Sequence, residues 1–384
     1  MKKLLIIHNK YQNIGGEDIA VLNEINFLKK HYKVETIIFE NNISNKFQQI
    51  FSFISNSNKL SNNIITSKIN EFKPEIIYLH NTWFKVSLGI FGILEKLNIP
   101  IFLKVHNFRY FCTKHFLNSK HFENSSFCPG CGNFYKKKLI NRYYKESFLK
   151  SLLILRYGIE YFKILKNNNI KILVLTEFHK KFMKNLGIDP NKINVFPNYT
   201  PDKFDISKSP KEYIIYAGRI SEEKGIENVI SSFLNAGVDN IKLFVAGDGP
   251  TKNSLQKKYQ SENIKFLGQL ENIEVVNLIA ESLAVVTGTK LFEGQPTFLC
   301  EASMMSVPSF FPRTGGIGEF FPKETNLSFE NRNYDELTEK FKLLNDKALL
   351  KNEGLRNKKY INKFLDEKKL LDTFSKIIQG INND

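Results

Sequence analysis

The sequence has few cysteines and no long apolar run, and each of these absences argues against a class of protein. Its 384 residues contain four cysteines and one tryptophan. So few cysteines cannot form a disulfide framework, which favours a reducing compartment. No apolar run approaches the ~20 residues that a transmembrane helix needs. The apolar stretch in the opening MKKLLIIHNK is also shorter than the ~7–15 residues of a secretory signal, so we interpret it as a buried first strand of a cytoplasmic protein.

Acidic residues are scarce in the first half of the chain. Residues 1–200 hold 30 basic and 13 acidic residues, a net charge of +17, whereas residues 201–384 hold 25 and 26, a net charge of −1. The segment 101–200 alone has 18 basic and 5 acidic residues. A basic half beside a neutral half predicts two domains with different partners. A genome that favours Lys, Asn and Ile is the alternative explanation, but it would affect both halves equally.

Short apolar runs alternate with stretches of helical periodicity. Strands are predicted at 4–8, 34–39, 76–80, 101–105, 172–175, 213–217, 241–246, 264–266, 284–287 and 308–311. Helices are predicted at 17–30, 88–97, 226–235, 251–260, 273–281 and 297–305, with more helix over 334–381. This order predicts an α/β protein of two doubly wound, Rossmann-like domains facing each other across a cleft. We expect domains at 1–196 and 213–365, with a proline-containing linker at 197–212.

Two motifs of the second half contain residues suited to a nucleotide. In YAGRISEEKG, Arg219 and Lys224 flank a loop that follows a strand and opens a helix, which suits a diphosphate, and Ser221 is a candidate helix cap. In LFEGQPTFLCEASMM, Glu293 and Glu301 lie eight residues apart, and Thr297 is a candidate cap. Both carboxylates can hydrogen-bond sugar hydroxyls. The alternatives are an ordinary surface loop in the first motif and a capping and a solvated carboxylate in the second.

Six phrases occur in an order that resembles a known family. They are IGGED, VFPN, YAGRISEEKG, VAGDGP, EGQPTFLCEA and TGGIGE, and they span roughly residues 1–325. Together they resemble the retaining nucleotide-sugar glycosyltransferases of glycosyltransferase family 4, which have the GT-B fold. One departure is Ser306, where the family usually has glycine before the last strand's proline. The resemblance also implies that the last helix, over 366–384, crosses back to the first domain.

The resemblance implies roles for individual residues. Arg219 and Lys224 would bind the donor diphosphate, Glu301 the ribose hydroxyls and Glu293 the transferred sugar. His106, which follows a predicted strand, would contact the donor sugar at the reaction centre without acting as a general base. The catalytic set is therefore His106, Glu293, Arg219 and Lys224. The rest of the donor site would comprise Gly15, Gly16, Gly294, Gln295, Pro296, Thr297, Phe298 and Glu301.

The sequence has no Asp-x-Asp pair, the usual metal–diphosphate signature of the other large glycosyltransferase fold. We therefore expect catalysis without a metal, by positioning and by electrostatic stabilisation of an oxocarbenium-like transition state. UDP is the commonest donor nucleotide in the family, so we expect a UDP-sugar.

Three of the four cysteines lie within twenty residues. Cys112, Cys128 and Cys131 include a C-x2-C pair, and His106, His115 and His121 are nearby. This spacing is compatible with a structural zinc site, and a cysteine-bearing loop without metal is the alternative.

Residues 135–166 interleave nine basic residues with Tyr, Phe, Leu and Ile, against two acidic ones. This pattern suits a helix lying on an anionic membrane, although an ordinary amphipathic helix is the alternative. We therefore expect a peripheral enzyme at the inner face of the cytoplasmic membrane, acting on a lipid or lipid-linked saccharide of envelope glycolipid or polysaccharide synthesis. Two alternatives remain: a GT-B enzyme with a soluble acceptor or an epimerase activity, and a basic nucleic-acid-binding protein. No nucleic-acid-binding signature appears, so we expect no nucleic-acid partner.

Overall fold

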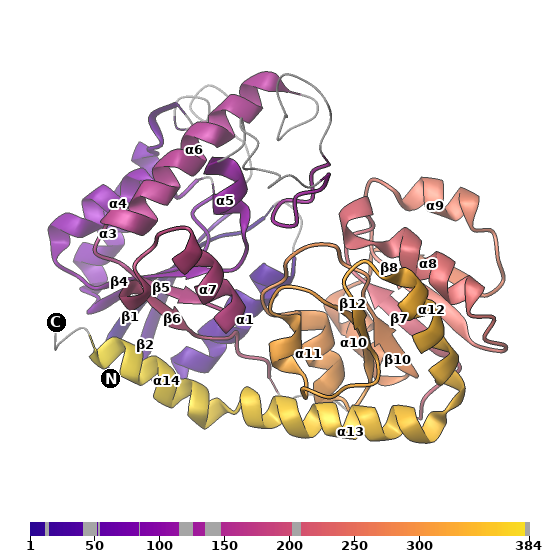
Figure 1. Ribbon diagram of the computed structural model, residues 1–384. Helices are drawn as coiled ribbons and strands as arrows, with labels where there is room; N and C mark the ends of the chain where they lie inside the picture. Colours follow the sequence, from indigo (N-terminus) through magenta and orange to yellow (C-terminus); the bar gives the residue numbers. More distant parts are fainter. Residues whose placement is uncertain are drawn as a thin grey trace. The chain divides into compact units, whose positions relative to one another are not determined.

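The computed structural model (Figure 1) describes residues 1–11, 15–40, 52, 54–83, 85–114, 126–134, 147–201 and 209–380. It divides into two units, with Met1–Tyr199 and Glu367–Asp384 in unit 1 and Thr200–Asp366 in unit 2. Unit 1 therefore runs past the expected boundary at 196. The physical reason is Tyr199, whose ring stacks on Phe27 at 4.8 Å and whose hydroxyl donates to Glu367 at 2.9 Å.

Unit 1 contains a six-stranded sheet in which every neighbouring pair is parallel. The order is β2-β1-β3-β4-β5-β6. The chain order of the strands reverses between β1 and β3, and ligands of open α/β sheets bind at the carboxyl ends of strands at such a switch point. The strands are β1 (Lys3–Asn9), β2 (Lys33–Phe39), β3 (Ile76–Leu79), β4 (Ile101–Val105), β5 (Lys171–Val174) and β6 (Ile193–Val195).

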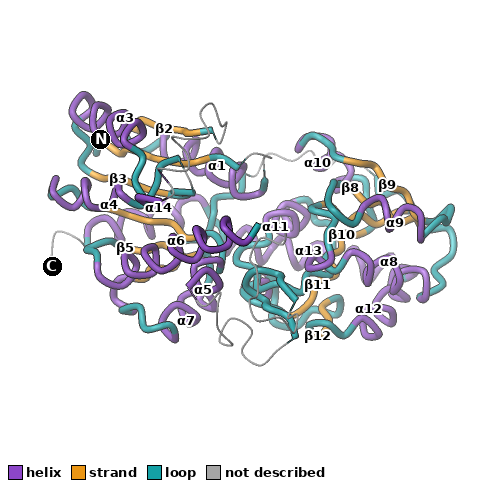
Figure 2. Tube along the Cα trace, turned by 90° about the horizontal axis from the view of Figure 1, so that it is seen from above, coloured by secondary structure: helices purple, strands orange, loops and turns teal. Residues whose placement is uncertain are grey.

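Helices cover both faces of this sheet (Figures 1 and 2). Alternate strand residues such as Leu5, Leu79 and Leu103 share one buried cluster with residues of α3, α4, α6 and α7. The helices of unit 1 are α1 (Gly16–Lys29), α3 (Lys59–Phe72), α4 (Gly89–Leu94), α5 (Arg109–Lys114), α6 (Phe148–Asn167), α7 (Glu177–Asn185) and α14 (Glu367–Gln379).

The last helix, α14, packs on the opposite face of the sheet of unit 1. Phe374 is fully buried, with ring centroids 5.6 Å from Tyr78 of β3, 6.5 Å from Phe102 of β4 and 5.2 Å from Phe196. Lys30 adds an exposed ion pair to Glu367 at 2.8 Å. The chain therefore returns to unit 1 after completing unit 2, held chiefly by a buried aromatic side chain.

Unit 2 contains a second parallel six-stranded sheet, in the order β12-β11-β10-β7-β8-β9. Its switch point lies between β7 and β10. The strands are β7 (Tyr213–Ala217), β8 (Lys242–Ala246), β9 (Ile264–Gly268), β10 (Ala284–Val286), β11 (Ser309–Arg313) and β12 (Ser328–Glu330). The helices are α8 (Ile226–Asn235), α9 (Lys252–Lys258), α10 (Asn272–Ala280), α11 (Thr297–Met304), α12 (Tyr334–Phe341) and α13 (Lys347–Phe364).

The predicted α/β fold of two doubly wound units is confirmed. Several unpredicted elements are also present, namely α3, α5, α7, β6 and β12. The predicted helix over 88–97 is α4 followed by the 3₁₀ helix η1 (Glu95–Leu97). Among the described residues, no helix combines the length and apolarity needed to cross a bilayer.

Candidate functional site

In unit 2, two predicted site residues meet at the carboxyl end of the sheet. Nζ of Lys224 lies 2.6 Å from Oε1 of Glu293, and Thr289 donates its hydroxyl to the same oxygen at 3.0 Å. Lys224 ends the 3₁₀ helix η4 (Glu222–Lys224), which follows β7, and Glu293 lies on the loop that follows β10. The pair therefore sits at the switch point, where a doubly wound sheet binds its ligand.

Arg219 lies two residues after β7 and is exposed. Ser221 is the N-cap of η4, but its side chain caps nothing, so the expected capping bond is absent. Its hydroxyl oxygen is buried and has no hydrogen-bond partner among the described residues.

The glycine-rich phrase TGGIGE packs directly against the Glu293 loop. A Cβ on Gly315 would lie 2.6 Å from both the backbone N and O of Glu293, and Gly315 has a φ of 58°. The backbone N–H of Gly316 donates to the Glu293 carbonyl at 2.8 Å. A glycine is therefore required at 315 for the close approach, and this loop fixes the position of the Glu293 backbone.

Glu301 lies in the second turn of α11, where its side chain is 7% exposed. Burial raises the pKa of this carboxyl to about 7, because desolvation disfavours the charged form. The prediction that Thr297 caps this helix is wrong. The N-cap is Pro296, and no side chain makes a capping hydrogen bond. Gly294 and Gln295 are buried on the preceding loop, and Phe298 is half-buried in the first turn.

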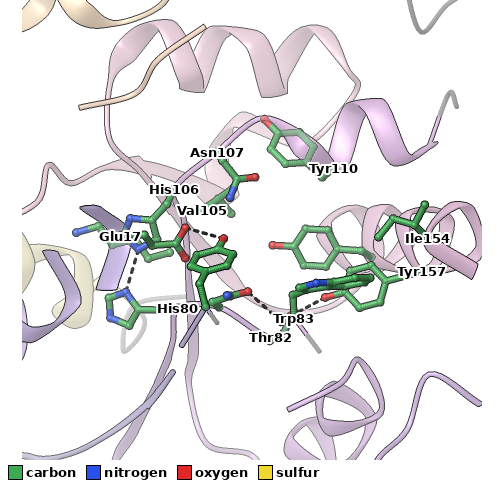
Figure 3. Close-up of a pocket in the computed structure, with 14 residues that line it drawn as sticks. Glu17, His80, Thr82, Trp83, Val105, His106, Asn107, Tyr110, Ile154 and Tyr157 are labelled. Carbon is green, nitrogen blue, oxygen red and sulfur yellow. Dashed lines mark hydrogen bonds between the residues drawn. The ribbon is translucent and has the colours of Figure 1, made fainter. Parts of the chain in front are cut away.

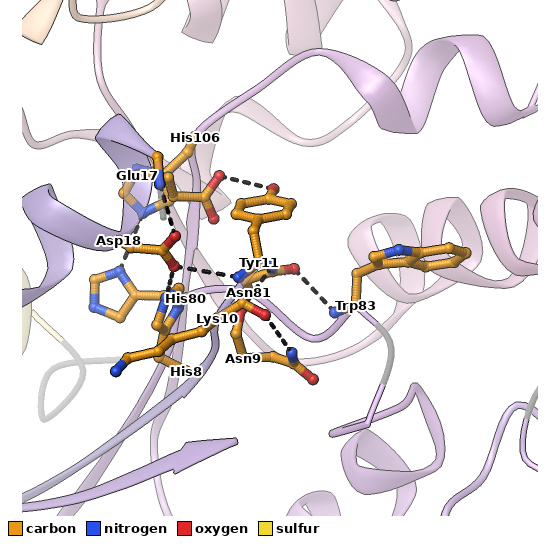
Figure 4. Close-up of polar contacts among 11 residues, drawn as sticks. His8, Asn9, Lys10, Tyr11, Glu17, Asp18, His80, Asn81, Trp83 and His106 are labelled. Carbon is orange, nitrogen blue, oxygen red and sulfur yellow. Dashed lines mark hydrogen bonds and ion pairs between the residues drawn. The ribbon is translucent and has the colours of Figure 1, made fainter. Parts of the chain in front are cut away.

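In unit 1, Gly15 is the N-cap of α1 and Gly16 its first residue. The carboxylate of Asp18 accepts the backbone N–H of Gly15 at 3.0 Å and also contacts Nε2 of His8 at 2.8 Å (Figure 4). Both Asp18 and His8 are buried. This carboxylate therefore connects the start of α1 to the end of β1.

His106 directly follows β4 and pairs with a second histidine. Its Nε2 lies 3.1 Å from Nδ1 of His80, which directly follows β3, and the two rings stack with centroids 5.4 Å apart. Burial lowers the pKa of both imidazoles well below the ordinary value, with further lowering from Lys104 and His8. Both rings are therefore neutral near pH 7, and one ring nitrogen donates to the other.

A pocket opens beside this histidine pair (Figure 3). Tyr11 donates its hydroxyl to Glu17 at 3.0 Å on one side. On the other, the Trp83 and Tyr157 rings meet edge to face at 4.6 Å, and Tyr157 stacks with Tyr161 at 5.9 Å. The full lining is Tyr11, Glu17, His80, Asn81, Thr82, Trp83, Lys104, Val105, His106, Asn107, Tyr110, Ile154, Tyr157 and Tyr161.

The predicted site contains only His106 of this lining. A usable signal exists in the sequence, because the dipeptide His-Asn occurs at 8–9, 80–81 and 106–107. These pairs fall at the carboxyl ends of the neighbouring strands β1, β3 and β4. Three repeats of one polar dipeptide at one sheet edge indicate a site rather than three unrelated loops.

The three clustered cysteines also come together in unit 1. The Sγ atoms of Cys112, Cys128 and Cys131 all lie within 4.8 Å of one another. Three histidines were considered as a fourth metal ligand. His106 is hydrogen-bonded to His80 instead, and His115 and His121 lie outside the described residues.

Comparison with known proteins finds similarity to glycosyltransferases. Residues 200–375 match the family model of the glycosyl transferases group 1. The chain is 27% identical over 233 residues to the capsular polysaccharide biosynthesis glycosyltransferase CapM of Staphylococcus aureus, covering 56% of this chain and 58% of that protein. The chain thus spans less than two thirds of this relative.

A second relative from Campylobacter jejuni is 26% identical over 137 residues, covering 34% of this chain and 36% of that protein. That relative is named as an alpha-1,4-N-acetyl-D-galactosaminyltransferase, and its name includes a saccharide linked to diNAcBac-PP-undecaprenol. Among solved structures, Anabaena Alr3699/HepE in complex with UDP and glucose superposes with a TM-score of 0.68 at 13% identity, covering 99% of this chain and all of that one. This likeness shows the GT-B fold.

Proposed function

We propose that this protein is a retaining, metal-independent glycosyltransferase of family 4, using a UDP-sugar as donor and a lipid-linked saccharide as acceptor. The observation that carries the proposal is the Lys224–Glu293 pair at the β7–β10 switch point, 2.6 Å apart within the segment that matches the family model. A cation that can meet a diphosphate and a carboxylate that can meet sugar hydroxyls are the two groups a nucleotide-sugar site needs.

The donor would bind across the loops of unit 2. Arg219 and Lys224 would neutralise the diphosphate as the bond to the sugar breaks, which is the stabilisation that a divalent metal supplies in other enzymes. Glu293 would turn from Lys224 to the sugar hydroxyls, and Glu301 would accept hydrogen bonds from the ribose. The backbone of Gly294, Gln295, Pro296, Thr297 and Phe298 would border the sugar.

The pocket of unit 1 would hold the acceptor saccharide. Sugar rings present flat C–H faces that stack on aromatic side chains, and Trp83, Tyr157 and Tyr161 provide such faces next to polar groups. Neutral His106 would hydrogen-bond the transferred sugar, and Gly15 and Gly16 would border the donor phosphates. The polar pair of Tyr11 and Glu17 would orient acceptor hydroxyls.

The helix α6 supports a lipid-linked acceptor at a membrane. Its pocket side carries Tyr157 and Tyr161, whereas Leu149, Leu152 and Ile159 are 66%, 36% and 38% exposed. The spacing of these three residues places them on one face of the helix, and the exposed cations Arg156 and Lys163 follow the same spacing. An apolar face with cations suits the surface of an anionic bilayer, here the inner face of the cytoplasmic membrane. Residues 135–146, the first part of the basic and aromatic stretch 135–166, lie outside the described residues.

A transfer assay tests the proposed activity. The purified chain is first screened by thermal shift against UDP, GDP and ADP, and then assayed with UDP-sugars and undecaprenyl-diphosphate saccharides, with the product anomer determined by NMR. We expect a shift with UDP and an α-linked product from an α-linked donor. Glu301→Gln should weaken both strongly, whereas Glu339→Gln, at an exposed carboxylate of α12, should leave both unchanged.

Other outcomes of this assay would identify the alternatives. Transfer to soluble sugars alone would indicate a GT-B enzyme with a soluble acceptor. Interconversion of the donor sugar would indicate an epimerase. Salt-sensitive DNA binding without turnover of any nucleotide sugar would contradict the proposed activity altogether.

Vesicle sedimentation tests the membrane contact separately. The full chain should sediment with vesicles containing anionic phospholipid at low salt, and the double variant Leu149→Ser/Leu152→Ser should sediment several-fold less. Ile273→Ser removes an equally exposed apolar side chain, 65% exposed, from unit 2 and should have no effect. Equal loss in the control would contradict a role for α6.

A further inference from the structure

The cysteine cluster is built from two separate segments of unit 1. Cys128 and Cys131 flank a tight turn, in which the Gly132 N–H donates to the Cys128 carbonyl and the Cys128 N–H donates to the Asn133 carbonyl, both at 2.9 Å. Phe127 and Phe134 close the turn with an antiparallel bridge. The C-x2-C pair is thus held on a defined backbone.

The third thiol comes from helix α5 and lies directly against this turn. Sγ of Cys112 is 3.3 Å from Sγ of Cys128, and both residues are buried. A Cβ on Gly130 would lie 2.8 Å from the Cys112 sulfur. Glycine at this position is therefore what allows the sulfur of α5 to approach the backbone between the other two cysteines.

These distances suit a metal better than a disulfide. Zinc–thiolate bonds of ~2.3 Å in a tetrahedron place sulfurs about 3.8 Å apart, and the three sulfurs here lie within 4.8 Å of one another. An S–S bond of ~2.05 Å could join only two of the three sulfurs. The side-chain amide of Asn133 also donates to Sγ of Cys131 at 3.3 Å, which is the kind of outer contact that orients thiolate ligands.

We propose that Cys112, Cys128 and Cys131 bind one structural Zn²⁺ and supply three of its four ligand positions. The ion would join α5 to the 126–134 turn. Because Tyr110 on α5 lines the pocket and its hydroxyl lies 3.0 Å from Nε2 of His179, the zinc would hold one wall of that pocket. This inference does not depend on the proposed glycosyltransferase activity.

Metal content of the full-length protein tests the site. The chain is purified without an affinity metal, dialysed against a weak chelator under reducing conditions, and analysed by plasma mass spectrometry. We expect about one zinc ion per chain. Cys112→Ser and Cys131→Ser should retain at least ten-fold less zinc. Cys300→Ser, at a buried cysteine of unit 2, should retain it fully.

Two further measurements keep the test decisive if the cysteine variants fold poorly. Asn133→Ala leaves all three thiols in place and should lower zinc affinity by about 10–100-fold. Replacing the ion with Co²⁺ in the wild-type chain should give the intense near-ultraviolet charge-transfer absorption of thiolate ligands. A wild-type chain that binds neither ion under reducing conditions, or a Cys300→Ser chain that loses zinc equally, would overturn the proposal.

Discussion

Nδ1 of His80 and Nε2 of His106 lie 3.1 Å apart, so the two imidazoles share one hydrogen bond at the carboxyl ends of β3 and β4. One ring must donate and the other accept, and this arrangement requires that the accepting nitrogen carry no proton. Burial and the neighbouring Lys104 and His8 lower the pKa of both rings. His179, whose Nε2 lies 3.0 Å from the hydroxyl of the pocket residue Tyr110, is fully buried, which lowers its pKa to about 3.

These histidines predict that unit 1 loses stability in mild acid. Because their folded pKa values lie below the unfolded value of ~6.5, the unfolded chain takes up protons first as the pH falls. The stability that they contribute is thus complete above pH ~6.5 and lost progressively below it. The single tryptophan, Trp83, reports unfolding of unit 1 by fluorescence during urea titrations at pH 7.5, 6.5 and 5.5.

The matched variant is His179→Phe, which removes one buried titrating ring. Its unfolding free energy should fall less steeply between pH 6.5 and 5.5 than that of the wild type, whatever its value at pH 7.5. Parallel curves for the two proteins would contradict the assignment.

Lys104 and Glu24 form an ion pair with both side chains fully excluded from solvent. The other carboxylate oxygen of Glu24 accepts the hydroxyl of Tyr78, and Lys104 lies 4.6 Å from the centroid of the Phe196 ring. Replacing one partner leaves a buried charge without compensation. Lys104→Met should therefore lower the unfolding free energy by about 3–5 kcal/mol.

Removing both charges gives the control for this pair. The double variant Lys104→Met/Glu24→Gln should recover most of the loss, because no buried charge is left without a partner and the Gln amide oxygen can still accept the Tyr78 hydroxyl. Urea unfolding followed by Trp83 fluorescence measures all three proteins. A double variant no more stable than Lys104→Met would show that the pair is not the cause.

Ser306 ends α11 with a φ of 60°, in the left-handed region. Its N–H donates to the Ser303 carbonyl and that of Val307 to the Ala302 carbonyl, the two bonds of a Schellman motif. Glycine adopts this conformation without the Cβ strain. Ser306→Gly should thus raise the unfolding free energy by about 0.5–1 kcal/mol, measured by thermal unfolding, and an equal or lower stability would contradict this.

The strands with longer, mostly apolar runs were predictable, and β4 and β7 begin and end where expected. The three-residue strands β6 and β12 have no such run, because parallel neighbours rather than local pattern determine them. In α3, the apolar positions Ile65, Ile69 and Phe72 have helical spacing, but asparagine and serine around them dilute the signal.

The candidate site, too, could be predicted from the sequence only in part. The motifs identify Lys224 and Glu293, but their contact depends on a fold that brings the ends of β7 and β10 together. The aromatic wall of the pocket has no local motif, because Trp83 and Tyr157 come from segments more than 70 residues apart. Within the sequence of α6, such tyrosines cannot be distinguished from ordinary core residues.

Lys224 and Glu293 should have separable effects on the donor. Lys224→Met removes the cation proposed for the diphosphate, so UDP itself should bind at least ten-fold more weakly. Glu293→Gln removes the carboxylate proposed for the sugar hydroxyls and leaves the Lys224 cation in the chain, so UDP affinity should be retained while sugar transfer falls by about 10²-fold. Calorimetry with UDP and a transfer assay distinguish the two. Weak UDP binding in Glu293→Gln would contradict a role confined to the sugar.

Glu301 predicts that nucleotide binding is coupled to a proton. Its carboxyl is buried with a pKa of about 7, and ribose hydroxyls donating to it would favour the charged form and lower that pKa. Binding UDP below pH 7 should therefore release a proton, and affinity should rise from pH 5.5 to 7 and level off above. Calorimetry in buffers of different ionisation enthalpy measures the proton directly. In Glu301→Gln the affinity should be weaker and this release absent, and an unchanged proton release would place the titrating group elsewhere.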